Sequence, residues 1–185
     1  MKITHLKKSD YTTSAWSGGT TTQLYIFPQD GNYAERRFKV RISSAAVDLA
    51  ESDFTALPGV DRWITPLMGG FTLTHPETWP DRAPVVMGPL SQPYNFPGGI
   101  ETHCVGKALD FNLMLKDAEG RMEIAASMAK IEKGLNAFYP IAETNVLVNG
   151  ESYMLEGGEL LVIESEREDS LLLGEGAVLC CYAQV

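Results

Sequence analysis

The sequence has little histidine and cysteine and no long hydrophobic run. Only 3 His and 3 Cys occur among 185 residues, and no Cys-x-x-Cys or His/Cys pair has the spacing of a zinc site. No stretch approaches the roughly 20 apolar residues needed to span a bilayer, and the first residues, MKITHLKKSDY, lack the apolar run of a signal peptide. We therefore expect a cytoplasmic protein with reduced thiols.

The cysteines, Cys104, Cys180 and Cys181, are odd in number, and adjacent cysteines rarely bridge each other because the geometry is strained. In a strand, Cys180 and Cys181 would point to opposite faces, and we expect one of the two to be buried.

Positive charge is also scarce. The formal net charge is −9, and the two densest basic clusters, Lys7-Lys8 and residues 36–41, are short. An acidic domain repels phosphate backbones, so neither a nucleic acid nor a membrane surface is an expected partner. Hydrophobic residues make up 44% of the chain, which is enough to form a core in one large domain or in two fused small ones.

Short β-type segments separated by glycine, proline and asparagine predict an all-β chain. The expected strands cover residues 20–27, 38–46, 61–67, 71–74, 102–105, 108–115, 145–148, 151–155, 159–163, 170–173 and 177–183. Residues 48–54 could form one helical turn, and residues 122–131 either a strand or a short helix. Residues 75–99 carry six prolines, so we expect a long loop there with a small edge strand near 83–87.

Three turns stand out between these segments. Asn149-Gly150 is the strongest short-range hairpin dipeptide. Gly69-Gly70 and Gly106-Lys107 also predict tight hairpins, each joining the strands on either side of it.

Five short motifs follow one another over the first two thirds of the chain. They are WSGGTTTQ (16–23), RISSA (41–45), FTALPGVDR (54–62), LMGG (67–70) and DFNLM (110–114). In this order they resemble the HutD/Ves family, and the resemblance runs essentially the full length. It implies a bicupin: one unit over residues 1–185 made of two interlocked jelly-roll-like β-barrels, with approximate halves 1–115 and 116–185.

The resemblance also carries functional expectations. Such proteins are associated with histidine utilisation or stress response in bacteria, and look like small-molecule-binding or regulatory proteins. The implied ligand for the histidine-utilisation branch is urocanate, or a formimino or formyl derivative of glutamate. Phe111 departs from the Asp-Leu-Asn form common among HutD members and is closer to the Ves form.

Cupin enzymes usually hold a metal through two closely spaced histidines, a glutamate and a distant histidine. Here His5, His75 and His103 are far apart in the sequence. We therefore expect no metal site and no cofactor.

Arg41 and Ser43 are the best candidates for ligand binding. They share one face of a predicted strand whose other face carries Phe38, Val40 and Ile42. An arginine at the mouth of a barrel can bind a carboxylate through two hydrogen bonds. The alternative is a surface arginine paired with one of the 24 acidic residues.

Asp110 and Asn112 share a second strand face with Met114, and could recognise a ligand nitrogen or satisfy buried backbone groups. Gln23 could complete the same cavity wall. Arg62 could be a second anion contact, or could lock the preceding turn.

Trp16 belongs to a glycine-rich segment that either faces the ligand or serves a close approach of two backbones.

Three functions remain open. The favoured one is a ligand-binding bicupin without catalysis, which takes a carboxylate metabolite. The second is a metal-independent enzyme, an isomerase or hydrolase, with Asp110 or His103 as general base. The third is a protein-interaction scaffold. A homodimer formed through strand edges is compatible with each of them.

Overall fold

The computed structural model describes residues 1–75 and 83–185. These residues form nineteen strands and one short 3-10 helix, η1 (Lys8–Asp10), which confirms the predicted all-β class. The chain divides into two compact units: residues 12–117 form one, and residues 1–11 with 118–185 form the other. The first eleven residues thus belong to the same unit as residues 118–185, whereas the expected halves were residues 1–115 and 116–185.

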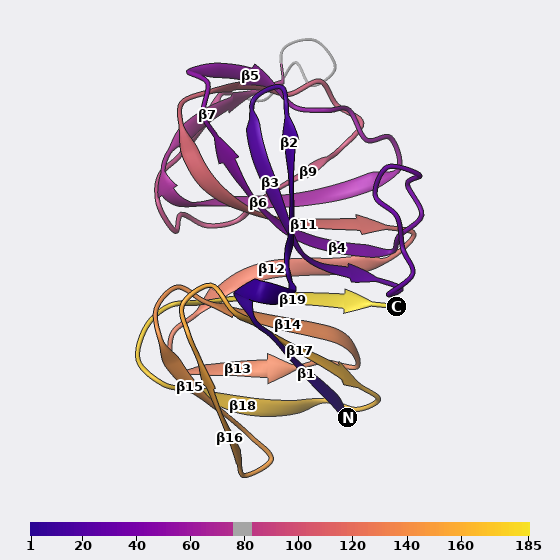
Figure 1. Cartoon of the computed structure of the whole chain (residues 1–185), viewed down its shortest axis with the longest axis vertical. Coiled ribbons are helices and arrows are strands. Elements are labelled where there is room, and N and C mark those ends of the chain that lie inside the picture. Colours follow the sequence, from indigo (N-terminus) through magenta and orange to yellow (C-terminus); the bar gives the residue numbers. More distant parts are fainter. Residues whose placement is uncertain (76–82) are drawn as a thin grey trace. The chain divides into compact units, whose positions relative to one another are not determined.

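The unit of residues 12–117 consists of two antiparallel sheets (Figure 1). The six-stranded sheet has the order β2 (Thr12–Trp16), β3 (Gly19–Phe27), β4 (Val40–Val47), β11 (Ala108–Lys116), β6 (Val60–Gly69) and β9 (Tyr94–Pro97). The four-stranded sheet has the order β5 (Glu51–Asp53), β10 (His103–Val105), β7 (Phe71–Thr74) and β8 (Val85–Met87). Buried residues of both sheets, including Ile64, Phe96, Leu73 and Cys104, form one hydrophobic cluster. The unit is therefore a two-sheet sandwich.

The other unit repeats this plan. Its five-stranded sheet has the order β1 (Lys2–Leu6), β17 (Leu160–Ser165), β14 (Gly134–Pro140), β19 (Val178–Gln184) and β12 (Glu119–Ala125). Its four-stranded sheet has the order β13 (Met128–Ile131), β18 (Asp169–Leu173), β15 (Thr144–Val148) and β16 (Glu151–Leu155). Phe138 and Leu161 of the first sheet and Val146 and Leu171 of the second lie in one core cluster.

The first strand of the chain is an edge strand of this later unit. β1 pairs antiparallel with β17, His5 opposite Leu161, and Figure 1 shows indigo β1 among the orange and yellow strands. His5 Nε2 lies 2.7 Å from the Glu159 carboxylate, and the Tyr11 hydroxyl donates to the Gly158 carbonyl at 3.0 Å. Residues 1–11 are thus fixed by backbone pairing and by side chains.

The two glycine turns predicted as hairpins are corners between sheets. β6 and β11 belong to the six-stranded sheet, whereas β7 and β10 belong to the four-stranded one, so Gly69-Gly70 and Gly106-Lys107 each carry the chain from one sheet to the other. The two corners meet: the Gly70 N–H donates to the Lys107 carbonyl at 3.2 Å. Gly69 and Gly106 have φ of 73° and 127°, and a Cβ on either would meet the backbone of the opposite corner.

Other local predictions can be compared directly with the strands. The Asn149-Gly150 hairpin is confirmed: Val148 pairs with Glu151, and both turn residues have positive φ. Residues 122–131 form two strands, β12 and β13. The helical turn expected at residues 48–54 is wrong, because that segment pairs with β10 as β5. β8 is the expected edge strand, while residues 76–82 of the proline-rich stretch lie outside the described residues.

The prediction that only one of the adjacent cysteines is buried is also wrong. Cys180 and Cys181 are both buried thiols, because both faces of β19 are covered. Burial raises the pKa of the Cys180 thiol to about 12, and burial also raises that of Cys181. Neither thiol is therefore activated for nucleophilic chemistry.

Candidate functional site

The site is built on three neighbouring strands of the six-stranded sheet, β4, β11 and β6. Met114 at the end of β11 lies opposite Arg41 of β4 on one side and opposite Arg62 of β6 on the other. Neighbouring strands are about 4.8 Å apart, so the Cα atoms of the two arginines are separated by roughly 10 Å. Because all three residues occupy one row, their side chains rise from the same face of the sheet.

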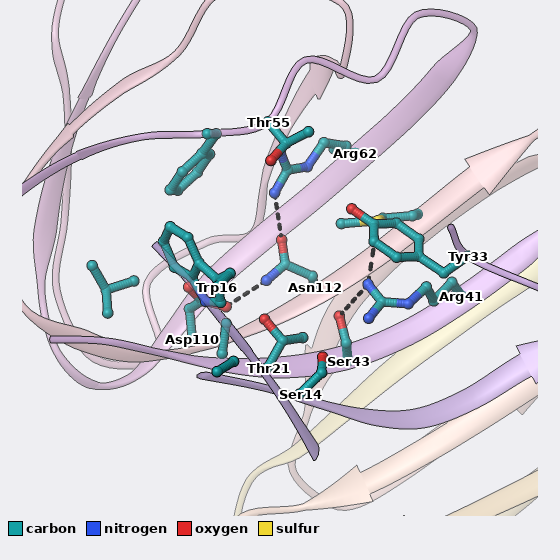
Figure 2. A pocket seen from close by; sticks show the side chains of 15 residues that line it. Ser14, Trp16, Thr21, Tyr33, Arg41, Ser43, Thr55, Arg62, Asp110 and Asn112 are labelled. Carbon is teal, nitrogen blue, oxygen red and sulfur yellow. Dashed lines mark hydrogen bonds between the residues drawn. The ribbon is translucent and has the colours of Figure 1, made fainter. Parts of the chain in front are cut away.

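A pocket of about 210 Å³ opens over this face (Figure 2). Apart from the two arginines, its polar lining includes Ser14, Thr21, Ser43, Thr55, Asp110 and Asn112. Tyr33 and Phe54, from the segments after β3 and β5, lie over the sheet and complete the walls. The volume suits a small metabolite and is below the usual range for drug-sized ligands.

Arg41 is held in the pocket by neutral groups. Its Nε donates to Gln23 Oε1 at 3.0 Å, and its Nη1 lies 3.3 Å from Ser43 Oγ. The guanidinium carbon lies 3.9 Å from the centre of the Tyr33 ring, a cation–π contact. Burial lowers the pKa of Arg41, although an arginine stays protonated in a protein. Its full positive charge is therefore present in the pocket.

Arg62 is buried in the same pocket. Its Nη2 donates to Asn112 Oδ1 at 3.2 Å, and the guanidinium lies over the rings of Phe54 and Phe96, at 4.9 and 5.2 Å from their centres. Burial lowers the pKa of Arg62, and the nearby carboxylate of Asp110 opposes that change. The Nε of Arg62 is buried and has no hydrogen-bond partner among residues 1–75 and 83–185.

Among the described residues, Asp110 is the one acidic residue that lines the pocket, and it is almost completely buried. Its carboxyl group accepts hydrogen bonds from the Asn112 side-chain amide and from the backbone N–H of Ala45. Burial raises the pKa of Asp110 to about 7, against the opposing effects of Arg62 and of these hydrogen bonds. The carboxyl group thus changes charge near neutral pH.

We expect this pKa to make the stability of the unliganded protein depend on pH. The folded state binds the Asp110 proton more tightly than the unfolded state, so this stabilisation is fully present below about pH 4 and is lost as pH rises through about 7. The contribution is about 4 kcal/mol at most. Urea unfolding at several pH values measures this effect. Between pH 5 and 8 the free energy of unfolding should change less for Asp110→Asn than for the native chain, and the two changes should differ on the order of 1 kcal/mol. The same pH dependence of the free energy of unfolding in both proteins would contradict the raised pKa of Asp110.

Trp16 is the last residue of β2 and lines the pocket just before the glycine-rich turn into β3. Its ring lies against Gly18, where a Cβ would collide with the ring, and a Cβ on Gly19 would collide with the Ala46 carbonyl of β4. The two glycines thus let β3 approach β4 while Trp16 covers the pocket. The indole Nε1 is buried without a hydrogen-bond partner among the described residues.

Gly18→Ala should therefore displace the Trp16 ring. Because the clash is with a side chain and the backbone conformation of Gly18 is ordinary, we expect a change in the free energy of unfolding below about 1 kcal/mol. Ligand affinity should fall about three- to tenfold, and tryptophan fluorescence should change. Gly88→Ala is the matched control, since a Cβ there meets nothing within 4 Å. Equal affinities for the two variants would contradict a role for Trp16 in the pocket.

The structure brings most of the predicted site residues together. Arg41, Ser43, Arg62, Asp110, Asn112 and Trp16 all line the pocket. Gln23 does not line it but holds Arg41. Tyr33, which also lines the pocket, was not predicted from the sequence. Its position next to the turn at residues 30–32 and shortly before Arg36-Arg37 was a possible signal of a cation–π contact.

His103 lies elsewhere. It is on β10, where its Nδ1 is 2.8 Å from the Asp53 carboxylate on the surface, and it does not line the pocket. Of the two candidate bases, only Asp110 is placed to meet a ligand. Within residues 1–75 and 83–185, no group of three or more His, Cys, Asp or Glu side chains could hold a metal ion.

Comparison with known proteins gives the chain a family. The sequence model of HutD matches residues 8–181, which include all five motifs. The chain belongs to the HutD family. No curated protein matches it at a significant level.

Solved structures show the same fold. HutD from Pseudomonas fluorescens SBW25 is 22% identical with a TM-score of 0.79, and a conserved protein of unknown function from Pseudomonas aeruginosa PAO1 is 20% identical with a TM-score of 0.85; each match covers 100% of both chains. Bacillus subtilis oxalate decarboxylase is 9% identical with a TM-score of 0.59, over 98% of this chain and 76% of its own. These likenesses confirm the bicupin fold of this HutD-family protein.

No helix in the part of the chain that the structure describes is long and apolar enough to cross a bilayer.

Proposed function

We propose that this HutD-family protein binds a small carboxylate metabolite in the pocket of its 12–117 unit, with Arg41 as the anchor for the carboxylate. The observation that carries the proposal is the pair of buried arginines, Arg41 and Arg62, in one pocket. Their hydrogen-bond partners among the described residues are two amide oxygens, a hydroxyl and a thioether sulfur, all neutral.

A buried cation without a bound counter-charge costs free energy. A ligand carboxylate would offset that cost, and its two oxygens match the planar donor geometry of a guanidinium. The faces of the Arg41 group are partly covered by Tyr33, which leaves its edge for the ligand. Gln23 and Ser43 already fix the orientation of that edge, so little side-chain entropy is lost on binding.

Family membership supports a link to histidine utilisation, and with it urocanate or a formyl or formimino derivative of glutamate as the ligand. All of these carry carboxylates. The pocket lining contains neither histidine nor cysteine, so it offers no Ser–His or Cys–His pair of the kind used in acyl transfer. This supports binding and regulation over catalysis.

The direct test is thermal unfolding of the purified protein with urocanate, formylglutamate, formiminoglutamate, glutamate and histidine. A ligand that binds only the folded state at a hundred times its Kd adds about 2.7 kcal/mol of stability, so we expect a clear rise in Tm with at least one of these acids. The methyl esters of the same acids are the control and should give no rise. No shift with any acid would overturn the proposal and favour an interaction scaffold.

A further inference from the structure

We propose that the ligand is a dicarboxylate whose two carboxylates meet Arg41 and Arg62, and that Asp110 takes up a proton when it binds. This inference rests on the proposed function of the pocket, and it adds the number of charges on the ligand and a coupling to pH.

Two separate cationic ends make the pocket suitable for a dianion. Arg41 and Arg62 lie at the two ends of one row across β4, β11 and β6, with Met114 between them, and Figure 2 shows the two guanidinium groups apart from each other, Arg62 hydrogen-bonded to Asn112 and Arg41 to Ser43. The sheet keeps their Cα atoms roughly 10 Å apart, and each guanidinium is held by its own partners: Gln23 and Ser43 bind Arg41, and Asn112 binds Arg62. The two groups therefore form separate subsites for carboxylates. Arg62 and Trp16 both line the pocket, and Arg62 Nε and Trp16 Nε1 are buried donors without a hydrogen-bond partner among the described residues, so a second carboxylate beside Arg62 could accept hydrogen bonds from them.

The charges in the pocket then require a proton. With Asp110 ionised, the two arginines leave one net positive charge, which a monocarboxylate neutralises. A dicarboxylate would leave one net negative charge in a buried space, which is unfavourable. Protonation of Asp110 by a proton from the solvent restores neutrality, and the new O–H can donate a hydrogen bond to the ligand.

Side-chain contacts join Asp110 to the site of the second carboxylate. Arg62 donates to Asn112, and Asn112 donates to Asp110. Arg62 is also the main charge that favours the ionised form of Asp110. When a ligand carboxylate engages Arg62, that stabilisation of the Asp110 anion weakens, and the proton binds more tightly. The pKa of about 7 in the unliganded protein means that a modest change is sufficient.

Within residues 1–75 and 83–185, few other charged groups face Asp110. The charged group on β6 that acts on Asp110 is Arg62. The titratable group on β10 is the buried Cys104 thiol, whose pKa Asp110 helps to raise. On β4 the residue directly opposite Asp110 is the neutral Ala45. Arg41 is four residues along β4 from Ala45. From the segments over the pocket come the neutral Trp16, Phe54 and Thr55 and the phenol of Tyr33. Proton uptake near neutral pH is therefore assigned to Asp110.

The test is isothermal titration calorimetry of the whole chain with succinate, glutarate and adipate, each compared with its own monoamide. Titrations at about pH 7.8 in Tris and in triethanolamine, two amine buffers with different enthalpies of ionisation, give the number of protons taken up. We expect at least one diacid to bind tenfold or more tightly than its monoamide. That diacid should take up most of one proton, and the monoamide almost none.

Two variants separate the parts of the proposal. Arg62→Gln should reduce the diacid to the affinity of its monoamide. Asp110→Asn should keep the preference for the diacid but abolish proton uptake. If either variant fails to fold, the pH dependence of binding to the native chain tests the proposal instead. The affinity for the diacid should fall up to tenfold per pH unit above about 7.5, while the affinity for the monoamide should stay constant.

The failures are distinguishable. Equal binding of diacids and monoamides, or binding of diacids without proton uptake, would overturn this inference and leave the carboxylate pocket intact. If the diacids do not bind but urocanate does, the inference is also wrong and the proposed function stands. If none of these acids binds, both are wrong.

Discussion

Replacing Arg41 with alanine is expected to lower the affinity for a carboxylate ligand by about a hundredfold or more. Loss of one partner of a buried, hydrogen-bonded charge pair typically costs 2–5 kcal/mol, and the guanidinium is oriented in advance by Gln23 and Ser43. Isothermal titration calorimetry with the acid that gives the largest thermal shift measures the effect. Unusually for a buried residue, Arg41 should be dispensable for folding: its partners are neutral, so the free energy of unfolding should change by less than about 1 kcal/mol or increase.

Two control variants sharpen this experiment. Arg167→Ala removes an exposed arginine, whose side chain is 75% accessible, and should leave affinity unchanged. Arg41→Lys keeps the charge but not the planar pair of donors, and should recover only part of the affinity. Equal binding by Arg41→Ala and the native chain would show that the ligand is anchored elsewhere.

The largest effect on stability is expected from Phe138→Ala. Phe138 is fully buried on β14, in the core cluster of the later unit, and makes an edge-on contact with Tyr182 at 6.4 Å between ring centres. Truncating a buried phenylalanine to alanine costs about 3–5 kcal/mol, because apolar contacts are lost and a cavity remains. Urea unfolding followed by circular dichroism measures this loss.

Leu172→Ala is the matched control for that variant. Leu172 lies on β18 of the same unit but is 54% exposed, so its truncation should cost less than about 0.5 kcal/mol. Similar losses for the two variants would contradict the position of the core described for this unit.

The sequence could predict which site residues share a strand face. Successive side chains of a strand alternate between its two faces, and this alternation depends only on neighbouring residues. The pattern around Arg41 and Ser43 placed both on one face, and the pattern around Asp110 and Asn112 did the same, so the sequence alone indicated two walls of the pocket. That these walls belong to adjacent strands depends on the pairing of β4 with β11, which alternation does not specify. The functional role of these residues stays a prediction.

The corners and the loop residue were harder to predict. Gly69 adopts a positive φ, which serves a hairpin and a change of sheet equally well, so the sequence signal is the same for both. Tyr33 reaches Arg41 from a connecting segment, and its position is set by that segment's own hydrogen bonds, such as those between Asn32 and Arg37. Such tertiary placement leaves no periodic trace in the sequence.

The pairing of β1 with β17 has a consequence for synthesis on the ribosome. The chain is made from the amino terminus at about 5–20 residues per second, so residues 2–6 emerge well before their partners at 160–164. All strands of the 12–117 unit are made in between. Residues 2–6 are therefore among the last to pair although they are made before the 12–117 unit, and until then they are an unpaired strand open to association with other chains.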